Sequence, residues 1–125
     1  METDQSKGKF DRWREDRFAI LENGLVISCP DIKAWAKWME ESFANGEHWI
    51  AKDEVCGFLI STVFLGINHR FSGPPIWFET KVFPASSDGE FLPNHIKRLE
   101  CTTKIGAVAG HAAVCEMVRT GEIGE

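Results

Sequence analysis

Residues 58–83 decide the fold, and they read FLISTVFLGI, then NHRFSGPP, then IWFETKVF. The first part is the richest of the chain in β-branched and aromatic residues, which favour strands. Its apolar side chains fall at both odd and even positions, so we predict a central strand covered on both faces. The third part predicts the return strand, and the Gly- and Pro-containing part between them predicts a loop. A long antiparallel hairpin is therefore the expected centre of the fold.

The segments before this hairpin predict a smaller hairpin, a helix and a further strand. Asn23 and Gly24 separate two apolar runs within residues 17–28, which is typical of a tight β-hairpin turn. A helix is expected over residues 30–44, because Pro30 suits a first helical position. Residues 48–55 have strand character. The predicted core face of the helix follows helical spacing and consists of Ile32, Trp35, Ala36, Met39 and Phe43.

The segments after the hairpin predict two helices of different length. Residues 95–100 predict a short helical segment, and residues 104–119 the last helix, with Thr102 or Thr103 as its N-cap. Gly106 and Gly110 weaken that helix intrinsically, so we expect them to mark a close approach to a strand. The residues predicted to face the sheet are Ile105, Val108, Ala112, Cys115 and Val118.

These elements predict an α+β fold, with an antiparallel sheet of about four or five strands, a central long hairpin and two packing helices. The chain of 125 residues fits one domain, which we place at residues 10–125. Residues 1–9 are polar and have nothing to bury, so we expect a disordered arm there. The strand with two apolar faces has only two helices to cover it, which predicts a homodimer or a higher homo-oligomer.

Charge and composition argue against several classes of protein. The net charge of −5 argues against general DNA binding, which needs clustered Lys and Arg. No apolar run approaches the ~18 residues of a membrane span, and the polar N-terminus has no signal-peptide pattern, so a cytoplasmic protein is expected. The cysteines form no Cys-x-x-Cys pair, so we expect free thiols, no structural disulfide, no structural zinc and no cofactor. They are Cys29, Cys56, Cys101 and Cys115.

The central segment also resembles a known group of proteins. Residues 61–71 read STVFLGINHRF, residues 73–83 read GPPIWFETKVF, and residues 109–111 read AGH. This pattern resembles an uncharacterised family of small proteins encoded by phages and prophages. Members of that family typically carry Asp where this chain has Asn68, which weakens a carboxylate–imidazole mechanism at that position. The resemblance implies an accessory protein of the bacterial host cytoplasm that binds a host or phage protein, or a small nucleotide, and inhibits a host defence or regulatory factor.

Two sets of residues are candidates for chemistry or for binding. His69, Glu79 and His111 could hold a metal or act in acid–base catalysis, but their spacings match no metal motif, so no metal site is predicted. In the alternative, His69 and Glu79 anchor the loop, and His111 packs against the sheet. The second set combines Arg, which can grip a phosphate, with aromatic rings, which can stack on a base. The predicted ligand or partner residues are Asn68, His69, Arg70, Phe71, Trp77 and Arg98.

The alternative for the second set is a solvated loop whose aromatic rings lie in the core. The function expected from the sequence is non-enzymatic binding by a phage-type accessory protein. A small metal- or His-dependent hydrolase is the second interpretation, and a virion or assembly component is the third. Bound metal would favour the hydrolase, bound nucleotide the accessory protein, and stoichiometric presence in particles the assembly component.

Overall fold

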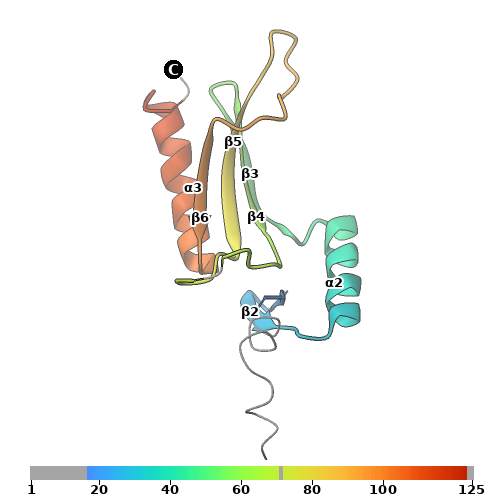
Figure 1. Ribbon diagram of the computed structural model, residues 1–125. Coiled ribbons are helices and arrows are strands. Elements are labelled where there is room, and N and C mark those ends of the chain that lie inside the picture. Colours follow the sequence, from blue (N-terminus) through green and yellow to red (C-terminus); the bar gives the residue numbers. More distant parts are fainter. Residues whose placement is uncertain (1–16, 71, 124–125) are drawn as a thin grey trace, which may run out of the picture.

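The computed structural model describes residues 17–70 and 72–123, and it has an α+β fold with two antiparallel sheets (Figure 1). One sheet pairs β1 with β2, and the other has the strand order β3-β4-β5-β6. The predicted fold class is confirmed. The predicted arm and the predicted ligand residue Phe71 lie outside the described residues. The elements are β1 (Ala19–Glu22), β2 (Leu25–Ser28), α2 (Ile32–Asn45), β3 (Trp49–Val55), β4 (Phe58–Phe64), β5 (Phe78–Pro84), β6 (Lys97–Cys101) and α3 (Lys104–Arg119).

The expected central hairpin is formed by β4 and β5, which pair along their whole length. β4 also pairs with β3 on its other edge. The turn between β3 and β4 contains Cys56 and Gly57, whose φ angles are 51° and 83°. Two-residue hairpins favour this left-handed conformation, because it matches the twist of the flanking strands. β4 therefore lies inside the sheet, as its apolar run predicts.

An edge strand takes the place of the short helix predicted over residues 95–100, and that prediction is wrong. β6 pairs with β5 in an antiparallel register that sets Leu99 opposite Thr80. Half-buried Leu99 and Cys101 alternate with exposed charged residues, and this period of two fits a strand with one face on the core. So short a helix gains few hydrogen bonds for its ordering cost, whereas β5 offers a whole edge for pairing.

The main core lies between α3 and one face of the four-stranded sheet (Figure 1). The sheet contributes Ile60, Phe78 and Val82 to this core, and all three are fully buried. Thr103 caps the helix with its side-chain oxygen, as predicted. The buried residues of α3 are Ala107, His111, Val114, Cys115 and Val118.

The rotation of α3 differs from the prediction for three residues. Ile105 is 85% exposed and Val108 is 50% exposed, and Ala112 is exposed as well. The cause lies at Gly110, where an added Cβ would stand 2.8 Å from Leu99 Cδ2. The helix backbone comes close to β6 there, so Gly110 faces the sheet, and the residues on the far side of the helix point outward.

The N-terminus of α2 differs slightly from the prediction. Asp31 Oδ1 accepts hydrogen bonds from the backbone N–H groups of Lys33 and Ala34, so Asp31 is the N-cap and the helix begins after it. Pro30 precedes the cap and is not the first helical residue. Gly46 ends the helix in the left-handed conformation, with a φ of 82°.

α2 and the small hairpin lie at the end of the sheet where β4 ends (Figure 1). The indole N–H of Trp35 donates a 3.0 Å hydrogen bond to the carbonyl oxygen of Gly66, just beyond β4. The ring of Trp38 packs edge-on against Phe64. Of the predicted core face of α2, Trp35 and Met39 are half-buried, whereas Ile32, Ala36 and Phe43 are exposed.

The second face of the four-stranded sheet is not covered by α3. β4 turns Leu59, Ser61 and Val63 to this face, because side chains alternate along a strand. The prediction of a homo-oligomer, which depends on this face, stays a prediction. None of the described helices is long and apolar enough to cross a membrane.

Candidate functional site

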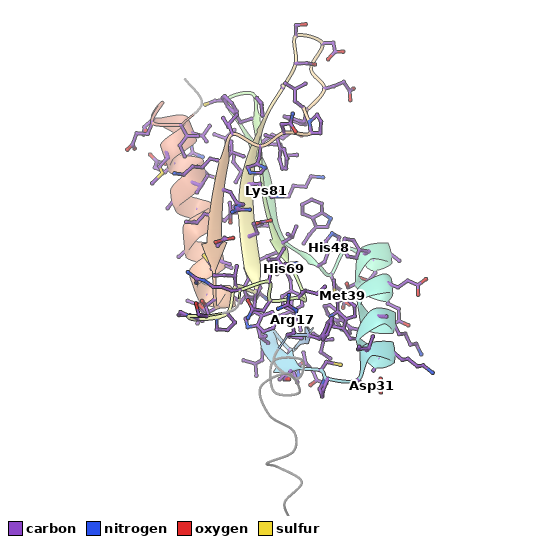
Figure 2. All side chains as sticks on the ribbon, viewed as in Figure 1. Arg17, Asp31, Met39, His48, His69 and Lys81 are labelled. Atoms are coloured by element: carbon purple, nitrogen blue, oxygen red, sulfur yellow. The ribbon has the colours of Figure 1, made fainter. Side chains whose placement is uncertain are left out.

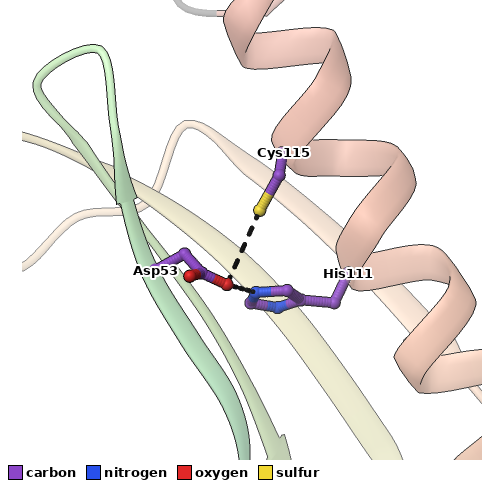
Figure 3. A group of neighbouring side chains, drawn as sticks. All are labelled: Asp53, His111 and Cys115. Atoms are coloured by element: carbon purple, nitrogen blue, oxygen red, sulfur yellow. Dashed lines mark hydrogen bonds and ion pairs between the residues drawn. The ribbon is translucent and has the colours of Figure 1, made fainter.

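The most connected polar group in the core is the imidazole of His111 on α3. Its Nδ1 lies 2.7 Å from Thr62 Oγ1 on β4, and its Nε2 lies 2.7 Å from Asp53 Oδ2 on β3 (Figure 3). Thr62 Oγ1 in turn lies 2.5 Å from Thr80 Oγ1 on β5. We call Asp53, Thr62, Thr80, His111 and Cys115 the His111 cluster. It joins α3 to three neighbouring strands.

Strand register and helical spacing bring these side chains to one place. Thr62 and Thr80 are directly opposite each other in the β4–β5 pair, and both point to α3, since Thr62 Oγ1 contacts Thr80 Oγ1 and His111 Nδ1. On β3, Asp53 is opposite the buried Ile60 and therefore points to the same side. His111 and Cys115 are four residues apart on α3, a spacing that places two side chains on one helical face.

The thiol of Cys115 completes the cluster next to the carboxylate. Its Sγ lies 4.0 Å from Asp53 Oδ2 (Figure 3). Burial is the main reason that the pKa of Cys115 is raised above its usual value, and the negative charge of Asp53 raises it further, whereas Arg119 lowers it. The thiol is therefore protonated at neutral pH and is not an activated nucleophile.

The hydroxyl pair of Thr62 and Thr80 gives His111 a partner in either tautomer. If Nε2 carries the proton, it donates to Asp53, and Nδ1 accepts from the Thr62 hydroxyl, which accepts from Thr80. If Nδ1 carries the proton, it donates to Thr62, which then donates to Thr80. A hydroxyl group can donate and accept, so Thr62 and Thr80 suit either direction of this chain. With the proton on Nδ1, however, Nε2 and Asp53 Oδ2 are two acceptors that face each other without a proton between them.

The structure does not bring Glu79 and His111 together. Thr80 faces α3, so the preceding residue Glu79 points to the opposite face of the sheet. There its carboxylate forms ion pairs with Lys81 at 3.4 Å and Arg98 at 3.6 Å. His69 is exposed in the loop after β4, at the end of the sheet next to the small hairpin (Figure 2). The three predicted candidates thus occupy three different places.

The predicted ligand residues are also distributed over separate places. Asn68 and Arg70 belong to the loop, where Asn68 Oδ1 accepts hydrogen bonds from the backbone N–H groups of Arg70 and Ile76. Trp77 is only 8% exposed and packs in the core with Phe64. Arg98 lies on β6, in ion pairs with carboxylates of the sheet face opposite α3. The loop itself keeps Asn68, His69 and Arg70 together.

The sequence-based prediction named His111 as a candidate for chemistry and Cys115 as a residue facing the sheet, but it missed Asp53, Thr62 and Thr80 as their neighbours. The spacing of His111 and Cys115 on a predicted helix was the available signal, because it places an imidazole and a thiol side by side. Nothing comparable marks Asp53, which is 58 residues away from His111 in the chain. Its position follows only from the pairing of β3 with β4.

Comparisons of the chain with models of protein families, with curated proteins and with solved structures gave no match. The resemblance to small phage-encoded proteins therefore stays a prediction.

Proposed function

We propose that this chain acts by binding an anionic partner through the loop that carries Asn68, His69 and Arg70, as a small accessory protein of the phage type. The observation that carries the proposal is an exposed imidazole and an exposed guanidinium on a loop whose backbone is held by hydrogen bonds. An ordered loop loses less conformational entropy on binding than a flexible one, so its contacts convert more fully into affinity.

The guanidinium of Arg70 is already oriented by the loop. Its Nη1 donates a 3.1 Å hydrogen bond to the carbonyl oxygen of Pro74. Gly73 lies beneath it, and a Cβ there would be 3.7 Å from Arg70 Cζ. An Arg side chain has five N–H donors in a planar fork, so the bond to Pro74 leaves further donors for a phosphate or a carboxylate.

The local charge favours an anion in spite of the net negative charge of the chain. No acidic residue occurs between Glu54 and Glu79 in the sequence, whereas this segment contains Arg70 and His69. An anion that approaches the loop therefore meets no carboxylate from residues 55–78. The expected partners are a nucleotide signal or an acidic surface of a host factor.

The chemistry of the core favours binding over covalent catalysis. The hydroxyl of Thr62 contacts His111, but Thr62 is fully buried, so no substrate reaches it. The thiol of Cys115 has a raised pKa, and a protonated thiol is a poor nucleophile. Neither side chain therefore combines access with activation, as a nucleophilic enzyme requires.

The test compares two charge-matched variants of the whole chain. Arg70→Ala removes the proposed contact, and Arg119→Ala removes the same charge from the end of α3. Binding is measured by calorimetry against a panel of mono-, di- and cyclic nucleotides and inorganic phosphate, and against a host factor where one is identified. Arg70→Ala should weaken binding about 10- to 100-fold, which corresponds to one charge-assisted hydrogen bond of about 1.5–3 kcal/mol.

Arg119→Ala should bind as the unmodified chain does. If both variants bind their ligand equally well, the loop is a connector and the proposal is wrong. Arg70→Lys separates charge from geometry, because Lys keeps the charge but lacks the planar fork. A variant that restores only part of the affinity would identify a bidentate contact.

A further inference from the structure

A second site, separate from the loop, lies where α3 crosses β3. We propose that Asp53, His111 and Cys115 together bind one transition-metal ion of the zinc class, with a fourth position open to solvent. One ligand atom from each side chain lies within 4.8 Å of the other two. The site uses none of the loop residues, so this proposal does not depend on the proposed binding function.

The three donor types select the metal. Imidazole nitrogen, thiolate sulfur and carboxylate oxygen are the ligands that Zn²⁺ uses, and its preferred geometry is tetrahedral. Hard cations such as Mg²⁺ and Ca²⁺ bind through oxygen ligands and would gain nothing from His111 and Cys115. A site with one ligand of each type therefore fits Zn²⁺ and its spectroscopic substitute Co²⁺.

Metal binding requires the ligand atoms to move, because they lie within 4.8 Å of one another and zinc ligands are about 3.4–3.6 Å apart. Around a tetrahedral zinc ion, a nitrogen and an oxygen ligand are about 3.4 Å apart, and a sulfur and an oxygen ligand about 3.6 Å. In the structure, His111 Nε2 and Asp53 Oδ2 are 2.7 Å apart, and Cys115 Sγ and Asp53 Oδ2 are 4.0 Å apart. The His111–Asp53 distance is that of a hydrogen bond, so the metal would replace the proton between them. It would also displace the thiol proton of Cys115, which leaves to the solvent, because a cysteine binds metal as the thiolate.

Asp53 is the ligand that can adjust. Its side chain is 57% exposed, whereas the side chain of His111 is 6% exposed. The two helix residues are thus fixed by packing, and the carboxylate at the edge strand closes the site from the solvent side. A metal bound there meets water at its remaining position, which is the arrangement of zinc sites with three protein ligands.

The Thr62–Thr80 pair supports the metal-bound tautomer. A histidine that binds metal through Nε2 must carry its proton on Nδ1, and such histidines almost always donate that proton to a hydrogen-bond acceptor. Thr62 Oγ1 lies 2.7 Å from Nδ1 and accepts it, while the Thr62 hydroxyl donates to Thr80. The same pair supports the metal-free state with the direction reversed, so the fold does not depend on the metal.

The experiment titrates the whole chain, reduced and freed of metal, with Co²⁺. A tetrahedral site with one thiolate should give a sulfur-to-cobalt charge-transfer band in the near ultraviolet and intense visible bands, saturating at one ion per chain. Zn²⁺ should abolish these bands by displacing cobalt. At Zn²⁺ concentrations about 100-fold above the dissociation constant, the melting temperature should rise by about 10 °C.

The decisive variants are Cys115→Ser and Asp53→Asn, because replacing buried His111 would also disturb folding. Cys115→Ser should lose the charge-transfer band, and Asp53→Asn should weaken Co²⁺ binding at least about 10-fold. The matched controls are Cys56→Ser in the β3–β4 turn and Glu54→Gln, the neighbouring carboxylate on β3. Both control residues are exposed, and both variants should bind cobalt as the unmodified chain does.

Circular dichroism confirms that each variant is folded. The proposal is overturned if the unmodified chain gives no charge-transfer band, if the band persists in Cys115→Ser, or if it disappears in Cys56→Ser. Arg70→Ala should keep the full cobalt spectrum. An unmodified chain that binds cobalt but no anion, or an anion but no cobalt, would show which of the two proposals fails.

Discussion

The two helices, α2 and α3, differ in how much of each is buried, and their sequences do not predict this difference. α2 has a regular apolar spacing and clear caps at both ends, yet Ser42 is its one fully buried residue. α3 contains two glycines, which lower its intrinsic helix propensity, yet five of its residues are buried. α3 contacts all four strands of the large sheet, whereas the main partner of α2 is β1.

Helix formation and helix packing therefore depend on different features of the chain. Local spacing and capping favour a helix in a given segment. The neighbours that the tertiary structure supplies decide which helix carries the core. In α3 the glycine at 110 lets the backbone approach Leu99, so the residue that weakens the helix locally improves its packing on the sheet.

The largest expected difference is between a phenylalanine beneath α3 and one on α2. Phe78 is fully buried in the same core cluster as Ala107 of α3, and Phe78→Ala should lower the free energy of unfolding by about 3–5 kcal/mol. Phe43 on α2 is 59% exposed, and Phe43→Ala should cost no more than about 1 kcal/mol. Urea unfolding measures both. Equal losses would mean that α2 carries as much of the core as α3.

The next difference concerns buried hydroxyl groups. Thr62→Val keeps the volume of the side chain but removes the hydrogen-bond partner of both His111 and Thr80. Leaving buried polar atoms unpaired should cost about 1–3 kcal/mol. Ser42 donates to the carbonyl oxygen of Met39 in its own helix, so Ser42→Ala should stay within about 0.5 kcal/mol, since Ala favours the helix. If Thr62→Val leaves the free energy of unfolding unchanged, water replaces the lost hydrogen bonds to His111 and Thr80.

The smallest expected difference is between the two N-caps, which should be nearly alike. Asp31 accepts from two backbone N–H groups of α2, and Thr103 accepts from Gly106 N of α3. Asp31→Ala and Thr103→Ala should each lower the free energy of unfolding by about 1 kcal/mol. The same urea measurements apply. A much larger loss at Thr103 would show that capping and packing are coupled in α3.

The elements that depend on neighbours in the chain could be predicted from the amino-acid sequence. The Asn23-Gly24 turn, the strand of β4, the return strand and an N-cap at Thr102 or Thr103 were all predicted, and the structure has them, with Thr103 as the cap. Turns, caps and alternation are local, because they depend on backbone conformation and on side chains a few residues apart. For the same reason, the α+β fold class could be predicted.

The contacts across the core, in contrast, depend on how distant segments of the chain pack together. β6 forms a strand because β5 has a free edge for it, and the rotation of α3 depends on its contact with Leu99. The His111 cluster joins side chains from three strands and one helix, and strand register is set by the pairing of distant segments. A sequence shows that an aspartate, a histidine and a cysteine are present, but the folded sheet and helix bring their ligand atoms together.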